Sequence, residues 1–182
     1  MSDSLDAADL QALQRGEKAA LDRLMVRWQI PLRAFLYRHL GHDHDALDLA
    51  QETFVRIYRH RDQFRSGARF STWMFQIALN LVRDQGRRSR RRPTDALDAG
   101  PEPVSESSPP ADLERAESVA AVRSAIAGLP PDLREALILS EYEDLSHAEI
   151  GAVVGATSKA VETRLYRARE LLRKQLQKWI RT

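Results

Sequence analysis

Residues 146–169 read SHAEIGAVVGATSKAVETRLYRAR, and this stretch carries the clearest structural signals in the chain. Ser146 and Glu149 have the spacing of a capping box, which predicts the start of a short helix. Gly155 is placed to end that helix, because glycine readily adopts the left-handed conformation found at helix C-termini. The expected buried side consists of Ile150, Val153 and Val154.

A longer helix follows the turn at Gly155. It starts at Thr157 or Ser158 and is expected to reach about Ile180. A short helix, a tight turn and a longer helix are the pattern of a helix-turn-helix, whose second helix enters the major groove of DNA. The alternative to a DNA-binding helix-turn-helix is an ordinary helical hairpin with a charged surface. The polar positions early in the longer helix are Ser158, Lys159, Glu162, Thr163, Tyr166 and Arg167.

The chemistry of this polar side suits duplex DNA. An arginine such as Arg167 can pair with guanine through two hydrogen bonds, and Glu162 can accept one from a cytosine amino group. Lys159 and Arg164 suit phosphates, which position a protein without reading sequence.

The N-terminal half contains a second polar face, on a helix whose buried stripe is Met74, Ile77, Ala78 and Leu81. Aromatic rings stack on unpaired bases, amides read base edges and arginines follow the backbone, so this face suits single-stranded nucleic acid. The alternative to base stacking is that Phe70 and Trp73 simply belong to the hydrophobic core. The face comprises Gln76, Asn80, Arg83 and Arg87, lies near Phe64, Phe70 and Trp73, and leads into five arginines within residues 87–92.

An earlier helix is expected to begin at Asp45, where an acidic residue caps the N-terminus. Its predicted buried stripe is Leu47, Ala50, Phe54 and Tyr58. Its outer, polar positions include Asp48, Gln51, Glu52, Arg56 and Arg59.

Between the two halves, residues 93–110 hold five of the eight prolines and lack apolar periodicity. Residues 1–94 carry 17 Lys and Arg against 11 Asp and Glu, whereas residues 95–118 carry 1 against 7. We therefore predict an all-α protein with two small helical domains, residues 1–92 and 116–182, joined by a flexible acidic linker over 93–115. Basic domains favour a polyanionic partner, although solvated helix surfaces give the same pattern.

Several classes of protein are disfavoured. The chain has no cysteine, its polar N-terminus is unlike a signal peptide, and no apolar run approaches the roughly 18 residues of a membrane span. We expect a cytoplasmic protein without membrane insertion. Possible metal ligands occur in one short stretch, where His39, His42 and His44 lie near Asp43 and Asp45. Their spacing fits no usual metal-binding motif, and no set of catalytic residues accompanies them. We therefore expect neither an enzyme nor a cofactor.

Four stretches together resemble the extracytoplasmic-function sigma factors, the smallest class of bacterial sigma factors. Residues 45–54, DALDLAQETF, are similar to the family's DAED-L-x-Q-E-x-F segment, and residues 70–80, FSTWMFQIALN, to its F-x-T-W-L-x-x-I-A-x-N segment. Residues 129–134, LPPDLR, resemble its L-P-x-x-x-R helix start. Residues 146–169 resemble its terminal helix-turn-helix, and the four motifs occur in the family's order.

The resemblance implies a transcription initiation factor that binds core RNA polymerase and promoter DNA. Asp48, Gln51 and Glu52 would bind the polymerase clamp, and the C-terminal domain would dock on the flap. Control by an anti-sigma factor is also implied. The implied −10 residues are Phe64, Phe70, Ser71, Asn80, Arg83, Arg87 and Arg88; the implied −35 residues are Ser158, Lys159, Glu162, Thr163, Arg164, Tyr166 and Arg167.

Two positions depart from the family pattern. Leu47 replaces an acidic residue of the clamp-facing helix, and Glu162 stands where many relatives have arginine.

Two other functions compete with the sigma-factor hypothesis. One is an autonomous DNA-binding regulator, which would usually need a dimer to reach two half-sites, and the other is a mimic that sequesters another regulator. Asn80 and the arginine run argue against mimicry, since a mimic needs neither.

Overall fold

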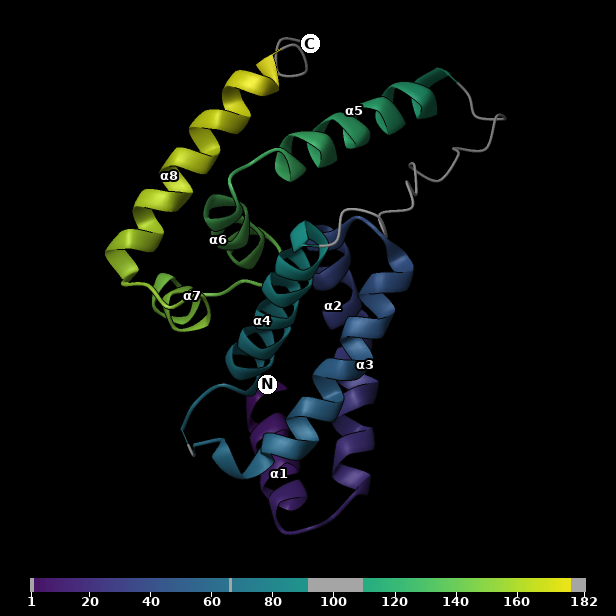
Figure 1. Ribbon diagram of the computed structural model, residues 1–182, viewed down its shortest axis with the longest axis vertical. Helices are drawn as coiled ribbons and strands as arrows, with labels where there is room; N and C mark the ends of the chain where they lie inside the picture. The colour runs from purple at the N-terminus through teal and green to yellow at the C-terminus, as the bar shows by residue number, and fades with distance from the viewer. Residues whose placement is uncertain (1, 66, 92–109, 178–182) are drawn as a thin grey trace.

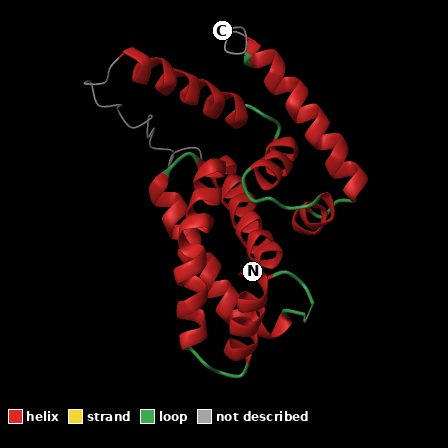
Figure 2. Ribbon diagram, turned by 180° about the vertical axis from the view of Figure 1, so that it is seen from behind, coloured by secondary structure: helices red, strands yellow, loops and turns green. Residues whose placement is uncertain are grey.

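The computed structural model describes residues 2–65, 67–91 and 110–177, and every regular element within them is helical (Figure 2). This confirms the predicted all-α class. The N-terminal domain contains α1 (Ser2–Gln14), α2 (Ala19–Leu40), α3 (Asp43–His60), a short 3-10 helix η1 (Arg61–Gln63) and α4 (Phe70–Arg91). The C-terminal domain contains α5 (Pro110–Ala127), α6 (Pro131–Glu141), α7 (His147–Val154) and α8 (Ser158–Gln175). None of the described helices is long and apolar enough to cross a membrane.

The core of the N-terminal domain lies among α2, α3 and α4. The rings of Phe35 and Phe75 pack with centroids 4.7 Å apart, and Ile57 and Met74 are fully buried beside them. On α3 the buried stripe is Ala46, Ala50, Phe54 and Ile57. The prediction that Leu47 belongs to this stripe was wrong: its neighbour Ala46 faces the core, and Leu47 is 44% exposed.

Helix α3 begins at Asp43, two residues before the predicted Asp45. Gly41 ends α2 in the left-handed conformation, with its N–H donating to the Tyr37 carbonyl at 2.8 Å, and His42 is extended. Arg33 of α2 then pairs with Asp43, donating from Nε to Oδ1 at 2.9 Å. This tertiary contact places the first acidic residue in the first turn of the helix.

Buried carboxylates attach α1 to α2. Asp6 is fully buried and accepts hydrogen bonds from Arg27 Nε at 2.8 Å and Trp28 Nε1 at 3.1 Å. Asp9 accepts from Arg23 Nε at 2.6 Å and also pairs with Arg27. Two arginines and an indole therefore compensate for the burial of these charges.

Helix α5 begins before the boundary predicted for the second domain. Helix α5 starts at Pro110, so its first turns occupy residues assigned to the linker, and the boundary expected at residue 116 falls inside a helix. A proline in the first turn is compatible with a helix start. The rest of the predicted linker, residues 93–109, lies outside the described residues. Helix α8 ends at Gln175, before the end that was expected near Ile180.

The two domains pack against each other, with α7 in contact with α4 (Figure 1) and α6 reaching α2. One cluster of buried side chains runs through both domains and includes Ala78 of α4 and Val153 of α7. Within the described residues, arginines of the N-terminal domain pair with glutamates of the C-terminal domain. The pairs are Arg38–Glu143 at 3.2 Å, Arg69–Glu149 at 2.6 Å and Arg83–Glu135 at 2.6 Å.

Candidate nucleic-acid interface

The turn between α7 and α8 is built by the residues that the sequence singled out. The Ser146 N–H donates to Glu149 Oε2 at 2.8 Å, and the Glu149 N–H donates to Ser146 Oγ, so the predicted capping box is confirmed. Gly155 ends α7 with φ of 75°, where its N–H donates to the Gly151 carbonyl at 2.9 Å.

Gly151 is a second required glycine, which the sequence analysis missed. A Cβ added to it would lie 2.5 Å from the carbonyl oxygen of Ala156, a backbone atom that cannot move without changing the turn. Its absence of a side chain therefore allows the turn to fold back tightly onto α7. The available signal was a glycine in the middle of a short, strongly capped helix.

Helix α8 begins as predicted and presents its polar side outward. Thr157 Oγ1 accepts from the Ala160 N–H at 3.2 Å, and Val161, Leu165 and Ala168 are buried. Tyr166 is 67% exposed, although it is a large aromatic residue. The other exposed positions on this side are Ser158, Lys159, Glu162, Thr163 and Arg167.

The charges along α8 are arranged partly by local pairs. Lys159 Nζ donates to Glu162 at 2.8 Å, and this hydrogen bond lowers the pKa of the Glu162 carboxyl. Arg164 is turned back toward Asp132 of α6, 3.6 Å away, and is half-buried. Arg167 is exposed, so it is the arginine of this set best placed for a partner in solution.

The polar face of α4 is only partly exposed. Gln76, Asn80 and Arg88 point to solvent, and Arg87 pairs with Asp84 on its own helix. Arg83 is instead half-buried against the C-terminal domain, where it donates from Nε and Nη2 to the two carboxylate oxygens of Glu135. The sequence placed Arg83 correctly on the helix face but gave no sign of this partner.

Two residues predicted to contact −10 DNA lie in the core instead. Phe70 is 1% exposed and packs against Trp28 with ring centroids 6.1 Å apart, and Ser71 is 3% exposed. Direct DNA contact by these two side chains is therefore incompatible with this arrangement. The alternative that Phe70 belongs to the core describes it better. Phe64 is half-buried and stacks on Trp73, with centroids 5.3 Å apart.

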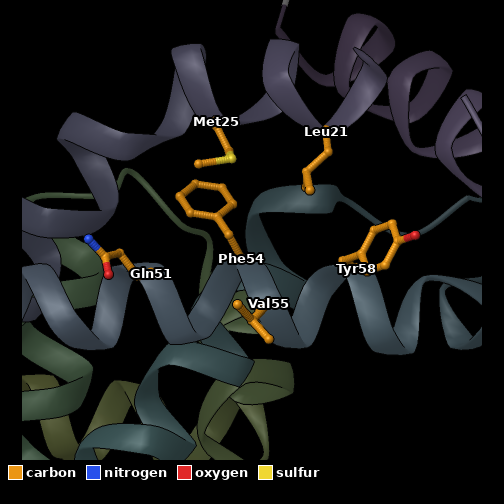
Figure 3. Close-up of a pocket in the computed structure, with 6 residues that line it drawn as sticks. All are labelled: Leu21, Met25, Gln51, Phe54, Val55 and Tyr58. Atoms are coloured by element: carbon orange, nitrogen blue, oxygen red, sulfur yellow. The ribbon is translucent and has the colours of Figure 1, made fainter. Parts of the chain in front are cut away.

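An apolar groove runs between α2 and α3 beside the residues predicted to bind the clamp. Leu21 and Met25 project from α2 toward Phe54 of α3, and Gln51 lies at one end (Figure 3). Asp48 and Gln51 are exposed, whereas Glu52 is half-buried and accepts from Arg56 at 2.9 Å. The groove was not predicted, because its two walls come from separate helices whose register only the folded domain sets.

The three histidines considered as metal ligands are not gathered at one site. His39 is buried in α2, with Nδ1 2.9 Å from the Phe35 carbonyl. His42 precedes α3, and His44 is exposed in its first turn, with Nδ1 3.4 Å from Asp48. Among the described residues, no group of three or more potential ligands is placed to hold a metal ion.

Comparisons with known proteins agree with this geometry. Residues 24–92 match the family model of Sigma-70 region 2, and residues 120–172 match that of Sigma-70 region 4. The chain is 35% identical over 181 residues to the RNA polymerase sigma-H factor of Pseudomonas aeruginosa, covering 94% of both. It is 34% identical over 191 residues to the ECF RNA polymerase sigma-E factor of Escherichia coli K12, covering 100% of both.

Solved structures of similar fold come from the same family. CnrH in complex with the cytosolic domain of CnrY has a TM-score of 0.73 and 28% identity, covering 95% of this chain and 97% of that one. The sigma factor RpoE of Bartonella quintana, in complex with the anti-sigma factor NepR, has a TM-score of 0.68 and 26% identity over 86% of this chain and 96% of that one. The chain belongs to the sigma-70 family, as an extracytoplasmic-function sigma factor that directs promoter-specific initiation by RNA polymerase.

Proposed function

We propose that the two domains divide promoter recognition, with α8 reading the duplex −35 element and α4 with its preceding loop capturing the melted −10 element. The observation that carries this proposal is the exposed polar side of α8, which follows a capped, glycine-closed turn of helix-turn-helix type. The role is one of binding rather than catalysis. It would be exercised in the cytoplasm, where RNA polymerase works.

At the −35 element, Arg167 reads a base and the neighbouring polar groups set its position. Its exposed guanidinium can donate two hydrogen bonds to guanine, and Tyr166 beside it offers an exposed ring for apolar contact with the groove. Lys159 contacts phosphate, while Glu162 remains ionised beside it and can accept from cytosine. Ser158, Thr163 and Arg164 support this contact from the same part of the helix.

At the −10 element, Asn80 reads a base that has left the stack. Its exposed amide offers both a donor and an acceptor to a base edge, and Arg87 and Arg88 follow the backbone on the next turns of α4. Phe64 and Trp73 form the stacked aromatic pair beside this surface. Phe70 and Ser71 act indirectly, by anchoring the start of α4 in the core.

Two surfaces that carry exposed apolar side chains suit the polymerase. We assign the groove beside Gln51 and Asp48 to the clamp coiled coil, because its apolar floor and polar rim fit an amphipathic helix. The exposed Val119 and Val122 of α5 and the hollow between α5 and α8 suit the flap. Tethering the two domains makes the second promoter contact effectively intramolecular once the first has formed.

An anti-sigma factor is the proposed regulator. The solved relative RpoE of Bartonella quintana is in complex with the anti-sigma factor NepR, and a similar fold offers a comparable surface here. Such a protein would compete with polymerase for the apolar surfaces of both domains.

Run-off transcription with purified core polymerase on a library of upstream sequences tests the proposal. Promoter-specific transcripts that require this protein, and that share two elements separated by a constant spacing, would support it. Transcripts that share only one element would contradict the division between domains. No transcript and no binding to core polymerase would favour an autonomous regulator.

A further inference from the structure

Helix α1 packs against the segment that carries one of the aromatic side chains proposed for the −10 element. The match to Sigma-70 region 2 begins at residue 24, so α1 lies outside it. In the structure α1 contacts both η1 and α4 (Figure 1). We call residues 61–64, from the start of η1 to its C-cap Phe64, the η1 turn. Helix α1 is therefore placed to set the position of this turn.

Gln14, the last residue of α1, reaches the backbone of the η1 turn. Its side-chain Nε2 donates to the Arg61 carbonyl at 2.7 Å and lies 3.4 Å from the Phe64 carbonyl oxygen. The Phe64 N–H donates to the same Arg61 carbonyl at 3.2 Å and so closes the turn. One half-buried amide therefore holds the carbonyls at both ends of the turn, 47 and 50 residues away in the sequence.

The helix that supplies Gln14 is itself firmly attached to the domain. Leu10 and Leu13 of α1 are fully buried in the core. On the side that faces α2, the buried carboxylate of Asp6 accepts from Arg27 at 2.8 Å and from the Trp28 indole at 3.1 Å. Because the backbone of α1 is already fixed, its last side chain can hold the turn with little further loss of conformational entropy.

The side chain that this turn places is Phe64. Its ring is half-buried and stacks on Trp73 of α4, with centroids 5.3 Å apart. Arg61 fixes the entry to the turn, because its Nη1 donates to the Tyr58 carbonyl at 2.7 Å and its guanidinium lies 4.7 Å from the centre of the Tyr58 ring. A ring that is to stack on a base binds more tightly when it is oriented beforehand.

We propose that Gln14 of α1 is a positioning residue for base capture at the −10 element: its amide holds the η1 turn, which keeps the Phe64 ring in place for an unpaired base. This inference rests on the proposed function for its consequence at the promoter, whereas its effect on the turn can be measured without DNA. At the other end of α1, Asp3 pairs with Arg69 at 2.9 Å, next to the start of α4. Helix α1 therefore supports both ends of the connection between α3 and α4.

The first measurement is amide hydrogen exchange of the full chain, followed by mass spectrometry. Gln14→Ala removes the donor but keeps a strong helix former, and Gln14→Glu keeps the side-chain size but turns a carboxylate toward two carbonyl oxygens. We expect exchange in residues 61–64 to be about fivefold faster in Gln14→Ala, because a hydrogen bond to the turn is lost, and faster still in Gln14→Glu. Gln11→Ala, at an exposed glutamine one turn earlier on α1, is the matched control and should leave the exchange unchanged.

The second measurement is run-off transcription with core polymerase on a promoter that the wild type uses, randomised at either the −10 or the −35 element. Gln14→Ala should reduce discrimination among −10 sequences by about fivefold, because Phe64 is no longer held in place. Discrimination among −35 sequences should stay unchanged, since α8 belongs to the other domain. A general loss of stability would lower transcription from both libraries without changing either preference.

Faster exchange together with a loss confined to −10 discrimination supports the proposal. Unchanged exchange in both Gln14 variants would overturn it, as would faster exchange with wild-type −10 discrimination or an equal loss at both elements. A wild-type chain that directs no promoter-specific transcription would reject the proposed function itself. The positioning role at the −10 element would fall with it, and faster exchange would then show a structural contact only.

Discussion

The two helices proposed to face DNA differ in what already holds their charged side chains. On α8, Arg167 and Tyr166 are exposed, and the pair Lys159–Glu162 lies at the surface. On α4, Arg83 is bound by Glu135 of the other domain, whereas Gln76, Asn80, Arg87 and Arg88 are exposed. The proposed DNA surface of α8 is therefore accessible in this structure, whereas one arginine of the proposed surface of α4 is held by the other domain.

The largest effect should come from filling the tight turn that supports α8. Gly151→Ala places a Cβ 2.5 Å from the Ala156 carbonyl, so we expect a loss of about 3 kcal/mol of stability. Gly155→Ala has open space but must keep φ near +75°, which costs about 1 kcal/mol. Urea denaturation followed by circular dichroism compares them. Equal losses would contradict the role given to Gly151.

Acidification should lower the stability of the fold through His39. Burial lowers its pKa to about 4, so the folded state holds it neutral while the unfolded chain takes up a proton below about pH 6.5. Arg38 and Arg134 also oppose its protonation, whereas the Phe35 carbonyl and Glu135 favour it. The stability from neutral His39 is complete above pH 6.5 and falls as the pH drops toward 4.

The measurement is the difference in unfolding free energy between pH 7.5 and 4.5. Relative to His39→Gln, the wild type should lose about 2 to 3 kcal/mol more over this range. His44→Gln, which removes an exposed imidazole, is the control.

Burial raises the pKa of Glu143 to about 7, against the pull of Arg38. The stability that protonated Glu143 contributes is therefore complete below pH 4.5 and falls as the pH rises through 7. The substitution Glu143→Gln should therefore remove a loss of stability that the wild type shows when the pH rises from 4.5 to 7.5.

Removing the exposed arginine of α8 tests the surface that is accessible in this structure. Arg167→Ala should weaken −35 duplex binding by about 5- to 150-fold and relax the preference at one base pair. Arg173→Ala, further along α8 and paired with Glu170, should cause a smaller loss without a change in preference. Fluorescence anisotropy on duplexes with single substitutions separates the two. Discrimination that survives in Arg167→Ala would argue against base reading.

The smallest expected effect concerns base capture on α4. Asn80→Ala should reduce opening of a double-stranded promoter by about tenfold, with less effect on a pre-melted one, because the amide acts only on an unstacked base. Gln76→Ala, one turn earlier on the same face, is the control. Permanganate footprinting measures strand opening. Equal defects on both templates would point to backbone contact.

Local signals in the sequence were sufficient for much of the secondary structure. Ser146 and Glu149, Thr157 and Gly155 act through bonds between residues close in the chain, and each stands in the predicted role. Of the predicted stripe, Met74, Ala78 and Leu81 are buried as expected, and Ile77 is half-buried. The start of α3 and the exposure of Leu47 were missed, because contacts with Arg33 and the register of α3 decide them. The burial of Phe70 was one of two alternatives, and packing against Trp28 decided between them.

The sequence by itself determined the helical class, the caps and turn of the helix-turn-helix, and the family, because these depend on spacing along one chain. Only the tertiary structure decided which of the predicted DNA-binding side chains are accessible. Arg83 and Arg167 look equivalent in sequence, yet one is bound by a glutamate 52 residues away and the other is exposed. Pairing across such distances depends on how the domains pack, and no local pattern records it.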